Sequence, residues 1–395
     1  MKVAHINVDW NSGGPGTIAN DICDIAEQRG IQCLAAYGRG NAETKYESYK
    51  IDSKLEFLAH TVLSRVFSNE GDWSFSATKR LLKKLDDFKP DIVHLHTFLG
   101  HYLNHGLLFR YLKENNIQTV WTIHDCSPFT GHCINFDRVK CEKWKDYCNN
   151  CPLKDDYPYG LFDVSEKTFF KRKKLYGDFD KLHIVVPSKW MAKIVEKSFL
   201  SKHEIHVINN GINLEQFCRV NTDLREQYKL QDKIVLLAVS YIWTEMKGWH
   251  ILNKLAELLD DRFSLVVIGN KDEKMMSKNI ISIPAISEKS KLIEWYSAAD
   301  IFVNPTLGDN FPTVNIEALS CGLPIVTCNT GGSPEIASNE VGRVVYSNTA
   351  EEFLVKINEY LEQAYSKDYC AEYAQRYDRK VCYEQYLKLY DRIVR

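Results

Sequence analysis

The sequence lacks a dominant charge, a long apolar run, internal repeats and low-complexity tracts. Its 395 residues carry 50 Lys and Arg against 52 Asp and Glu, which gives a formal charge of −2. Nucleic-acid binders usually carry a strongly basic domain, so this balance argues against nucleic acid as a partner. No window approaches 18 consecutive apolar residues, so no helix is expected to span a bilayer.

The N-terminal residues also lack the apolar core and small-residue cleavage site of a signal peptide. The segment 1–10 has instead the composition of a β-strand. We therefore expect a cytoplasmic protein, with peripheral attachment to the inner face of the cell membrane left open. In that compartment the 12 cysteines should be thiols or metal ligands rather than disulfides.

What the chain does have is a globular composition, with 45% hydrophobic and 26% charged residues. Its length suggests about two domains. Short apolar runs alternate with segments of helical periodicity, and runs that are apolar throughout indicate strands buried on both faces of a parallel sheet. The pattern predicts an α/β fold of two doubly wound, Rossmann-like domains. A single barrel is the weaker alternative, because the series is interrupted near 125–180 and 212–232.

The expected strands cover both halves of the chain: 3–10, 31–37, 91–96, 119–124, 183–187, 206–210, 233–240, 264–269, 300–306 and 323–328. Polar residues and an Asn-Gly turn place the domain boundary just after Gly211, so we expect domains at 1–212 and 213–376. The end of the chain reads as amphipathic helix, with a break near Asp378. Ligands of such sheets bind beyond the carboxyl ends of the strands, which places the site in a cleft between the two domains.

The first glycine-rich segment follows the first strand and opens a helix. Gly13, Gly14 and Gly16 would let backbone N–H groups approach an anion at the helix N-terminus. The third glycine of a dinucleotide fingerprint is absent. A tight turn without a ligand explains the segment about as well.

His124 and Asp125 end another expected strand. A histidine there can donate to a ligand hydroxyl or stabilise charge. The alternative is a histidine that caps the following loop. The histidines at 94, 96, 101 and 105 crowd the neighbouring junction, where polar groups lining an acceptor pocket are favoured over a metal site.

The strongest local signal is a pair of carboxylates eight positions apart, Asp309 in a loop and Glu317 in the helix that follows. Glu317 can accept hydrogen bonds from a vicinal diol, and Asp309 can contact another polyol. A second glycine loop, Gly331-Gly332, stands at a helix start and suits phosphate. Ordinary helix-dipole benefit, about 0.3–1 kcal/mol per acid, does not explain the surrounding Gly, Phe and Pro residues.

These segments together resemble the retaining glycosyltransferases of family 4 on the GT-B fold, a group that holds many capsule and O-antigen enzymes. The matching residues run through nearly the whole chain: 13–16, 124–125, 187–189, 210–212 with Phe217, 247–248, 309–317, 322–324 and 331–335. The GT-B fold implies that the last helix, 377–395, packs back on the N-terminal domain.

The resemblance implies a role for each matched residue. Glu317 would hold the donor ribose, Asp309 the hydroxyls of the transferred sugar, and Lys247 the diphosphate. His124 would face the reacting sugar, with Gly14 beside the phosphates. The residues assigned to donor binding are Gly13, Gly14, Gly16, Lys247, Asn310, Phe311, Glu317, Gly331 and Gly332.

The implied reaction moves a hexose from a UDP- or GDP-sugar to a hydroxyl of a glycan acceptor with retained anomeric configuration. No catalytic metal is expected, because a cation and backbone amides can stabilise the departing diphosphate. The family usually has an arginine a few residues before the lysine, and 240–247 contains none. Two alternatives stay open: transfer to a small soluble acceptor, and a catalytically silent sugar-binding or zinc-dependent interaction protein.

Five of the cysteines fall within the irregular insertion 126–155. Four thiolates around one zinc would staple such a segment, and Cys133, Cys141, Cys148 and Cys151 are the expected ligands. Only Cys148 and Cys151 have the two-residue gap of a zinc knuckle, so separate thiols stay an equal alternative.

The basic segment 167–176 mixes five cations with aromatic residues. A helix that carries them could lie on anionic lipid, each cation contributing about 1 kcal/mol near the surface. A solvated basic face is the competing interpretation. The segment motivates a lipid-linked acceptor and a peripheral membrane contact.

Overall fold

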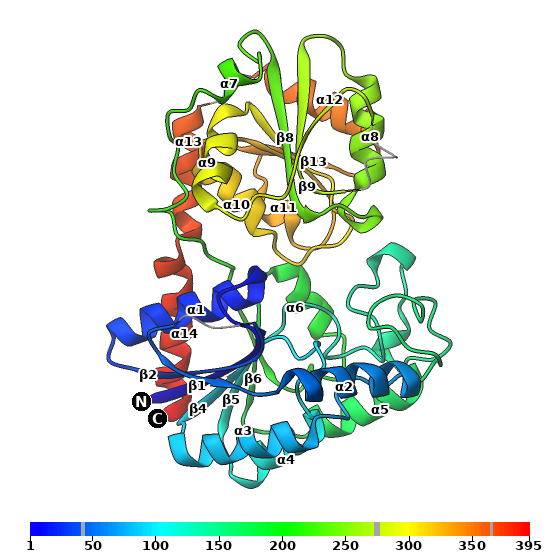
Figure 1. Cartoon of the computed structure of the whole chain (residues 1–395), viewed down its shortest axis with the longest axis vertical. Coiled ribbons are helices and arrows are strands. Elements are labelled where there is room, and N and C mark those ends of the chain that lie inside the picture. Colours follow the sequence, from blue (N-terminus) through cyan, green and yellow to red (C-terminus); the bar gives the residue numbers. More distant parts are fainter. Residues whose placement is uncertain (41–43, 272–276, 364–365) are drawn as a thin grey trace. The chain divides into compact units, whose positions relative to one another are not determined.

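The computed structural model describes residues 1–40, 44–271, 277–363 and 366–395. They form two compact units (Figure 1). The first unit comprises Met1–Asn209 and Cys382–Arg395, and the second comprises Asn210–Val381. The expected boundaries at 212 and 377 therefore lie close to those of the structure without coinciding with them.

The first unit is built on a seven-stranded sheet in the order β3-β2-β1-β4-β5-β6-β7, with every neighbouring pair parallel. The strand bounds are β1 Lys2–Asp9, β2 Gln32–Arg39, β3 Glu47–Lys50, β4 Ile92–Leu95, β5 Gln118–Thr122, β6 Leu182–Val186 and β7 Glu204–Val207. The helices are α1 Gly13–Gln28, α2 Lys54–Phe67, α3 Phe75–Phe88, α4 His105–Glu114, α5 Ser165–Tyr176 and α6 Lys189–Val195.

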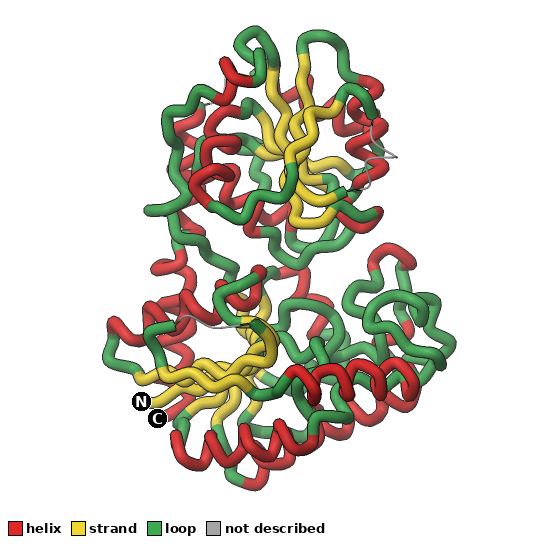
Figure 2. Tube along the Cα trace, in the orientation of Figure 1, coloured by secondary structure: helices red, strands yellow, loops and turns green. Residues whose placement is uncertain are grey.

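The second unit has a six-stranded parallel sheet in the order β10-β9-β8-β11-β12-β13. Its strands are β8 Ile234–Ile242, β9 Phe263–Asn270, β10 Ile280–Ile283, β11 Ile301–Asn304, β12 Ile325–Cys328 and β13 Gly342–Val345. Its helices are α7 Leu224–Gln227, α8 Trp249–Leu258, α9 Lys289–Ala298, α10 Thr313–Ser320, α11 Ser333–Ile336, α12 Ala350–Leu361 and α13 Lys367–Ala374. Two parallel sheets, each flanked by helices (Figure 2), confirm the predicted fold class.

Each sheet is covered on both faces, which explains its apolar strands. All four residues of β4 are buried, and one face packs on α3 and α4 while the other packs on α1 and α14 (Arg379–Val394). In the second unit α9 and α10 cover one face, and α8 and α12 cover the other. A parallel sheet requires this double cover, because its crossover helices lie on its faces.

The break predicted near Asp378 is confirmed. Helix α13 is followed by a single 3-10 turn, Asp378 is extended (φ −60°, ψ 134°), and α14 begins at Arg379. From Cys382 onward the chain belongs to the first unit. There Tyr383, Tyr386 and Tyr390 are buried in the same core layer as α1.

The strands that sequence patterning did not predict are β3, β10 and β13. The residues of β3 are mostly exposed at the edge of their sheet, so they carry no apolar run. Among the described residues, no helix is long and apolar enough to cross a membrane.

Candidate active site

The second unit brings two of the predicted site residues into direct contact. Lys247 Nζ lies 2.9 Å from Asp309 Oδ2, and both side chains keep part of their surface open to solvent. Lys247 ends the short 3-10 helix η3 (Glu245–Lys247), which Thr244 caps through its hydroxyl. The next residue, Gly248, has φ +78°, and a Cβ there would lie 2.3 Å from the carbonyl oxygen of Pro305. The turn that aims Lys247 therefore requires glycine.

The two loops predicted to bind the donor pack directly on each other. Gly331 has φ +56°, and a Cβ at this position would lie 1.6 Å from the carbonyl oxygen of Asp309. The N–H of Gly332 donates to the carbonyl oxygen of Asn310 at 2.9 Å. Thr330 Oγ1 donates to the carbonyl oxygen of Thr306 at 2.7 Å. The loop after β11 and the loop after β12 thus form one surface at the carboxyl ends of their strands.

Glu317 lies on α10, half-buried beside this surface. Tyr296 on α9 donates its hydroxyl to Glu317 Oε2 at 3.0 Å. Burial raises the pKa of the Glu317 carboxyl, against hydrogen bonds from Tyr296 and Thr313 and the charge of Lys289, which lower it. Sequence reasoning missed Tyr296, because a buried aromatic residue on an amphipathic helix reads as core. The only feature of Tyr296 that could have indicated a role in the site is its hydroxyl, which needs a hydrogen-bond partner when it is buried.

Phe311 does not present its side chain to the loop surface. Its side chain is 2% exposed and packs in the core against Tyr377, with ring centroids 5.7 Å apart. Its carbonyl oxygen accepts from Asn210 Nδ2 at 3.0 Å. Because the ring is apolar and follows a turn into α10, it is buried, so only the backbone N–H of Phe311 could contact a donor. Asn310 stays half-exposed on the loop surface.

The three glycines of the first unit that were assigned to donor binding, Gly13, Gly14 and Gly16, differ in their exposure. Gly13 and Gly14 are exposed at the start of α1. Gly16 is buried, and a Cβ there would lie 3.0 Å from the carbonyl oxygen of Asp9. We therefore assign Gly16 to the packing of α1 on β1 rather than to direct donor contact. The roles of Gly13 and Gly14 stay predictions.

His124 follows β5 and lies at the end of a chain of histidines. His124 Nε2 lies 3.3 Å from His96 Nδ1, and His96 Nε2 lies 3.2 Å from His5 Nδ1. Burial lowers the pKa of His124 to about 4, so the ring is neutral near pH 7. The neighbouring Asp125 caps the loop that follows, since its Oδ1 accepts from the N–H of Ser127 at 2.7 Å.

The neighbouring histidines at 94, 96, 101 and 105 are buried, and the acceptor pocket expected along them stays a prediction. His94 and His96 are at most 2% exposed. His94 contacts the hydroxyls of Tyr390 and Thr122 at 2.5 and 2.8 Å. A strand buried on both faces turns its polar residues inward as well as its apolar ones, so these rings form part of the core.

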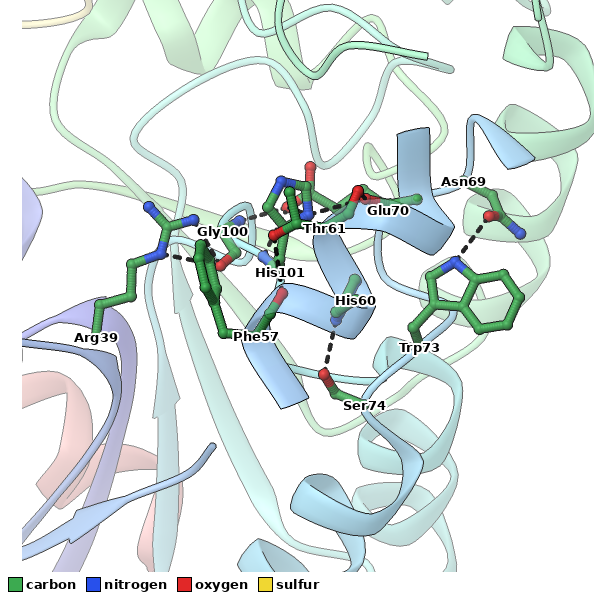
Figure 3. Close-up of polar contacts among 11 residues, drawn as sticks. Arg39, Phe57, His60, Thr61, Asn69, Glu70, Trp73, Ser74, Gly100 and His101 are labelled. Atoms are coloured by element: carbon green, nitrogen blue, oxygen red, sulfur yellow. Dashed lines mark hydrogen bonds and ion pairs between the residues drawn. The ribbon is translucent and has the colours of Figure 1, made fainter. Parts of the chain in front are cut away.

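Sequence reasoning also missed a polar cluster where β2 and β4 end (Figure 3). Arg39 donates to the carbonyl oxygen of Gly100 at 2.7 and 3.1 Å. Glu70, with a side chain only 3% exposed, accepts from the N–H groups of Gly100 and His101. Beside this cluster lies a hollow of about 300 Å³ lined by residues that include Arg39, Lys50, Asp52, Lys54 and Phe57.

Comparison with known proteins decides the family. The family model described as "Glycosyltransferase Family 4" matches residues 12–216, and the model described as "Glycosyl transferases group 1" matches residues 220–377. The chain belongs to glycosyltransferase family 4. It is a glycosyltransferase with the GT-B fold, as the sequence resemblance implied.

Two curated relatives and one solved structure illustrate the likeness. The chain is 24% identical to the putative colanic acid biosynthesis glycosyl transferase WcaC of Escherichia coli, over 100% of both chains. It is 28% identical to the Campylobacter jejuni N,N'-diacetylbacillosaminyl-diphospho-undecaprenol alpha-1,3-N-acetylgalactosaminyltransferase, over 52% of this chain and 58% of that one. Anabaena HepE in complex with UDP-glucose superposes with a TM-score of 0.70 at 14% identity, covering 99% of this chain and 100% of that one.

The basic segment of this family 4 chain forms α5 but is not a free cationic face. Phe169 is fully buried, and Arg172 is 6% exposed. Arg172 donates to the carbonyl oxygens of Ser127 and Thr130, and Lys171 pairs with Asp72. The five-cation lipid surface predicted for α5 is therefore wrong in part, since two of its cations are held by protein groups.

Proposed function

We propose that this glycosyltransferase moves a hexose from a UDP- or GDP-sugar to a hydroxyl of a lipid-linked glycan during surface polysaccharide synthesis, with retention of configuration. The donor class is supported by the likeness to HepE, whose structure holds UDP-glucose. Polysaccharide synthesis is supported by WcaC, and a lipid-linked acceptor by the Campylobacter relative, whose name includes diphospho-undecaprenol.

The observation that carries the proposal is the Lys247–Asp309 pair on the surface built by the Gly331 loop. A half-exposed ammonium beside backbone N–H groups suits the diphosphate of a nucleotide-sugar. Asp309 is then free to accept from hydroxyls of the transferred sugar. Glu317, oriented by Tyr296, has a second carboxylate oxygen for the ribose hydroxyls.

For the chemical step we propose that Lys247 and backbone amides stabilise the negative charge that develops on the diphosphate. The bond between the anomeric carbon and the diphosphate breaks, and the acceptor oxygen bonds to the same face of that carbon. The acceptor proton passes to the departing diphosphate oxygen, so no side-chain base is needed. A role for His124 in contacting the reacting sugar is part of this proposal.

The acceptor side of the proposal rests on α2, a helix whose apolar face points outward. Its buried residues are His60, which contacts the hydroxyl of Ser74 at 2.7 Å (Figure 3), and Ser64, which contacts His101 at 3.0 Å. The apolar residues at helical spacing are exposed instead, among them Leu55 (79%), Leu58 (58%) and Val62 (52%). A soluble helix normally buries this stripe, so we propose that it lies against lipid.

The apolar stripe extends beyond α2. The N–H of Leu161 donates to the carbonyl oxygen of Arg65 at 3.0 Å, and the N–H of Phe162 donates to Ser68 Oγ at 2.7 Å. These bonds place two further exposed apolar side chains at the end of α2. A contiguous apolar surface of this kind marks a docking site.

The hollow at the start of α2 suits the phosphates of a lipid carrier. Among the described residues that line it, Arg39, Lys50 and Lys54 contribute three cations and Asp52 contributes one carboxyl. Burial raises the pKa of Asp52 to about 6, which weakens its negative charge near neutrality. We propose that an acceptor diphosphate binds here while its lipid follows the apolar face of α2.

The test is transfer from a panel of UDP- and GDP-hexoses to polyprenyl-diphosphate glycans in vesicles and to the same glycans without lipid. The expected result is transfer from one donor to the lipid-linked acceptor, with the anomeric configuration of the product equal to that of the donor by NMR. Glu317→Ala should abolish transfer, while Glu257→Ala, an exposed carboxylate on α8, should not. Equal transfer to lipid-free glycan would overturn the lipid-linked acceptor, and inverted product would overturn retention.

A further inference from the structure

The segment 123–164 of the first unit is long and irregular. Between β5 and α5 it contains only two 3-10 turns, η1 (Asp137–Val139) and η2 (Lys143–Lys145), and Figure 2 shows the rest as loop. Loops of this length inside a compact unit are uncommon. Its backbone nevertheless carries buried side chains, including Phe129, Phe136 and Trp144. These side chains pack in the hydrophobic core of the first unit, although the backbone around them forms no helix or strand beyond the two 3-10 turns.

Four cysteines of the segment surround one small cavity. Cys133, Cys141, Cys148 and Cys151 all line it, together with His132 and Trp144. The cavity has a volume of about 10 Å³, which is the size of a single water molecule or ion. Cys133 and Cys148 are almost fully buried, and Cys141 and Cys151 are half-buried. All four are free thiols.

Backbone N–H groups already point at the sulfur atoms. The N–H of Gly131 donates to Cys148 Sγ at 3.2 Å. A Cβ on Gly131 would lie 2.1 Å from the carbonyl oxygen of Ser165 and 2.8 Å from Cys148 Cβ, so only glycine allows this approach. The backbone of Leu153 likewise forms a hydrogen bond with the Cys151 sulfur. Such donors stabilise thiolates rather than thiols.

Cations also surround the cavity. Arg172 is 6% exposed and donates to the carbonyl oxygens of Ser127 and Thr130. Its charge favours the thiolate of Cys148. Lys143, on the rim, donates to the carbonyl oxygens of Asn149 and Asn150. A negatively charged group in the cavity would be attracted by these two cations.

We propose that Cys133, Cys141, Cys148 and Cys151 bind one structural zinc ion that staples segment 123–164. Four thiolates are a ligand set that selects zinc with tetrahedral geometry. As each sulfur–zinc bond forms, the thiol releases its proton to solvent, so binding is accompanied by the loss of up to four protons and leaves a site of net charge −2.

The zinc site lies beyond donor binding and does not depend on the proposed reaction. Because the segment begins immediately after β5, at the residues before His124 and Asp125, the zinc would also fix the loop that these residues open. Loss of the ion should therefore loosen this loop while leaving the second unit unaffected. This outcome separates the zinc proposal from the proposed function, which depends on the second unit.

The experiment is metal analysis of the full chain, produced without a histidine tag and dialysed without chelator. About one zinc per chain is expected for the unaltered protein and for Cys218→Ser, an exposed thiol outside the segment. Cys148→Ser and Cys151→Ser should each lose most of the zinc. Replacement of zinc by Co²⁺ should give the intense visible absorption of a tetrahedral thiolate site.

Three outcomes would overturn the zinc site. One is less than a tenth of a zinc per chain together with no Co²⁺ absorption. Another is zinc that persists in both cysteine variants, which would place the ion elsewhere. The third is loss of free thiols in the denatured, metal-free chain, which would show disulfides in place of ligands. If the cysteine variants fail to fold, Co²⁺ absorption of the unaltered protein alone decides the matter.

Discussion

Lys247 Nζ and Asp309 Oδ2, 62 residues apart in sequence, lie 2.9 Å apart in the second unit. Their backbones follow β8 and β11, two strands that are neighbours in the sheet. The pair therefore links the carboxyl ends of adjacent strands, which is where open α/β sheets bind ligands. Both partners keep part of their surface exposed, so a ligand can take over either one.

The first prediction concerns Lys247→Met. Hydrogen bonds to charged groups are worth about 1.5–3 kcal/mol, so affinity for the nucleoside diphosphate should fall roughly 10- to 100-fold. Stability should change little, because exposed ion pairs contribute about 0–1 kcal/mol. Isothermal titration with UDP and GDP measures the first effect and thermal unfolding the second. Lys254→Met, which removes an exposed lysine paired with Glu257 on α8, is the matched control and should bind normally.

The second prediction uses the raised pKa of Glu317. A carboxyl whose pKa is higher in the folded chain than in the unfolded chain stabilises the fold at low pH, and this stabilisation is lost as pH rises through the folded pKa. Glutamine keeps the shape and still accepts from Tyr296 but cannot ionise. Relative to the unaltered chain, Glu317→Gln should therefore be more stable at pH 8 than at pH 5. Thermal unfolding across that range measures the difference.

The same substitution should weaken donor binding about tenfold or more, because a charged acceptor for the ribose hydroxyls is lost. Stability and binding thus move in opposite directions. A variant that loses both stability at pH 8 and donor affinity would show that Glu317 has a structural role instead.

The fold was predictable because double burial leaves a strong mark in sequence. The residues of β4 and β12 are all buried, and their apolar runs predicted them. The edge strand β3 gave no such run, since its residues are mostly exposed. Of the site, the loops after β11 and β12 were predicted from their acids and glycines, and the loop after β8 was predicted only from the resemblance to family 4.

The features that were not predictable depend on the direction in which a side chain points, which the spacing of apolar residues along the sequence does not show. Helical spacing cannot say which face of a helix points inward, so the outward apolar stripe of α2 was not predicted. The burial of the Phe311 ring was not predictable for the same reason. Its place within a motif indicated ligand contact, while its burial follows from the turn into α10 that the motif creates.

The third prediction compares two glycines with left-handed backbones. Alanine at Gly30 (φ +74°) meets nothing within 4 Å, so Gly30→Ala should cost only the left-handed strain of about 1–2 kcal/mol. Alanine at Gly331 would in addition collide with the carbonyl oxygen of Asp309. Gly331→Ala should therefore be less stable than Gly30→Ala in denaturant unfolding, and it alone should lose affinity for the nucleoside diphosphate. Equal affinity in both variants would separate the Gly331 loop from donor binding.

The fourth prediction concerns the exposed face of α2. Burying a leucine or valine side chain is worth about 1.5–3 kcal/mol, so removing one from lipid should lower membrane partition roughly tenfold or more. Leu58→Glu and Val62→Glu should each reduce flotation with anionic liposomes. Their side chains are 58% and 52% exposed, so the melting temperature should hardly change.

Val355→Glu on α12 provides the matched control for that experiment, because Val355 is 53% exposed and lies in the second unit. The same change of charge and polarity is made there, away from α2. Equal flotation of both α2 variants and the control would show that the apolar stripe of α2 does not bind lipid. If flotation fell in the α2 variants alone, and fell further at high salt, the apolar stripe and the neighbouring cations Lys54 and Arg65 would share the binding energy.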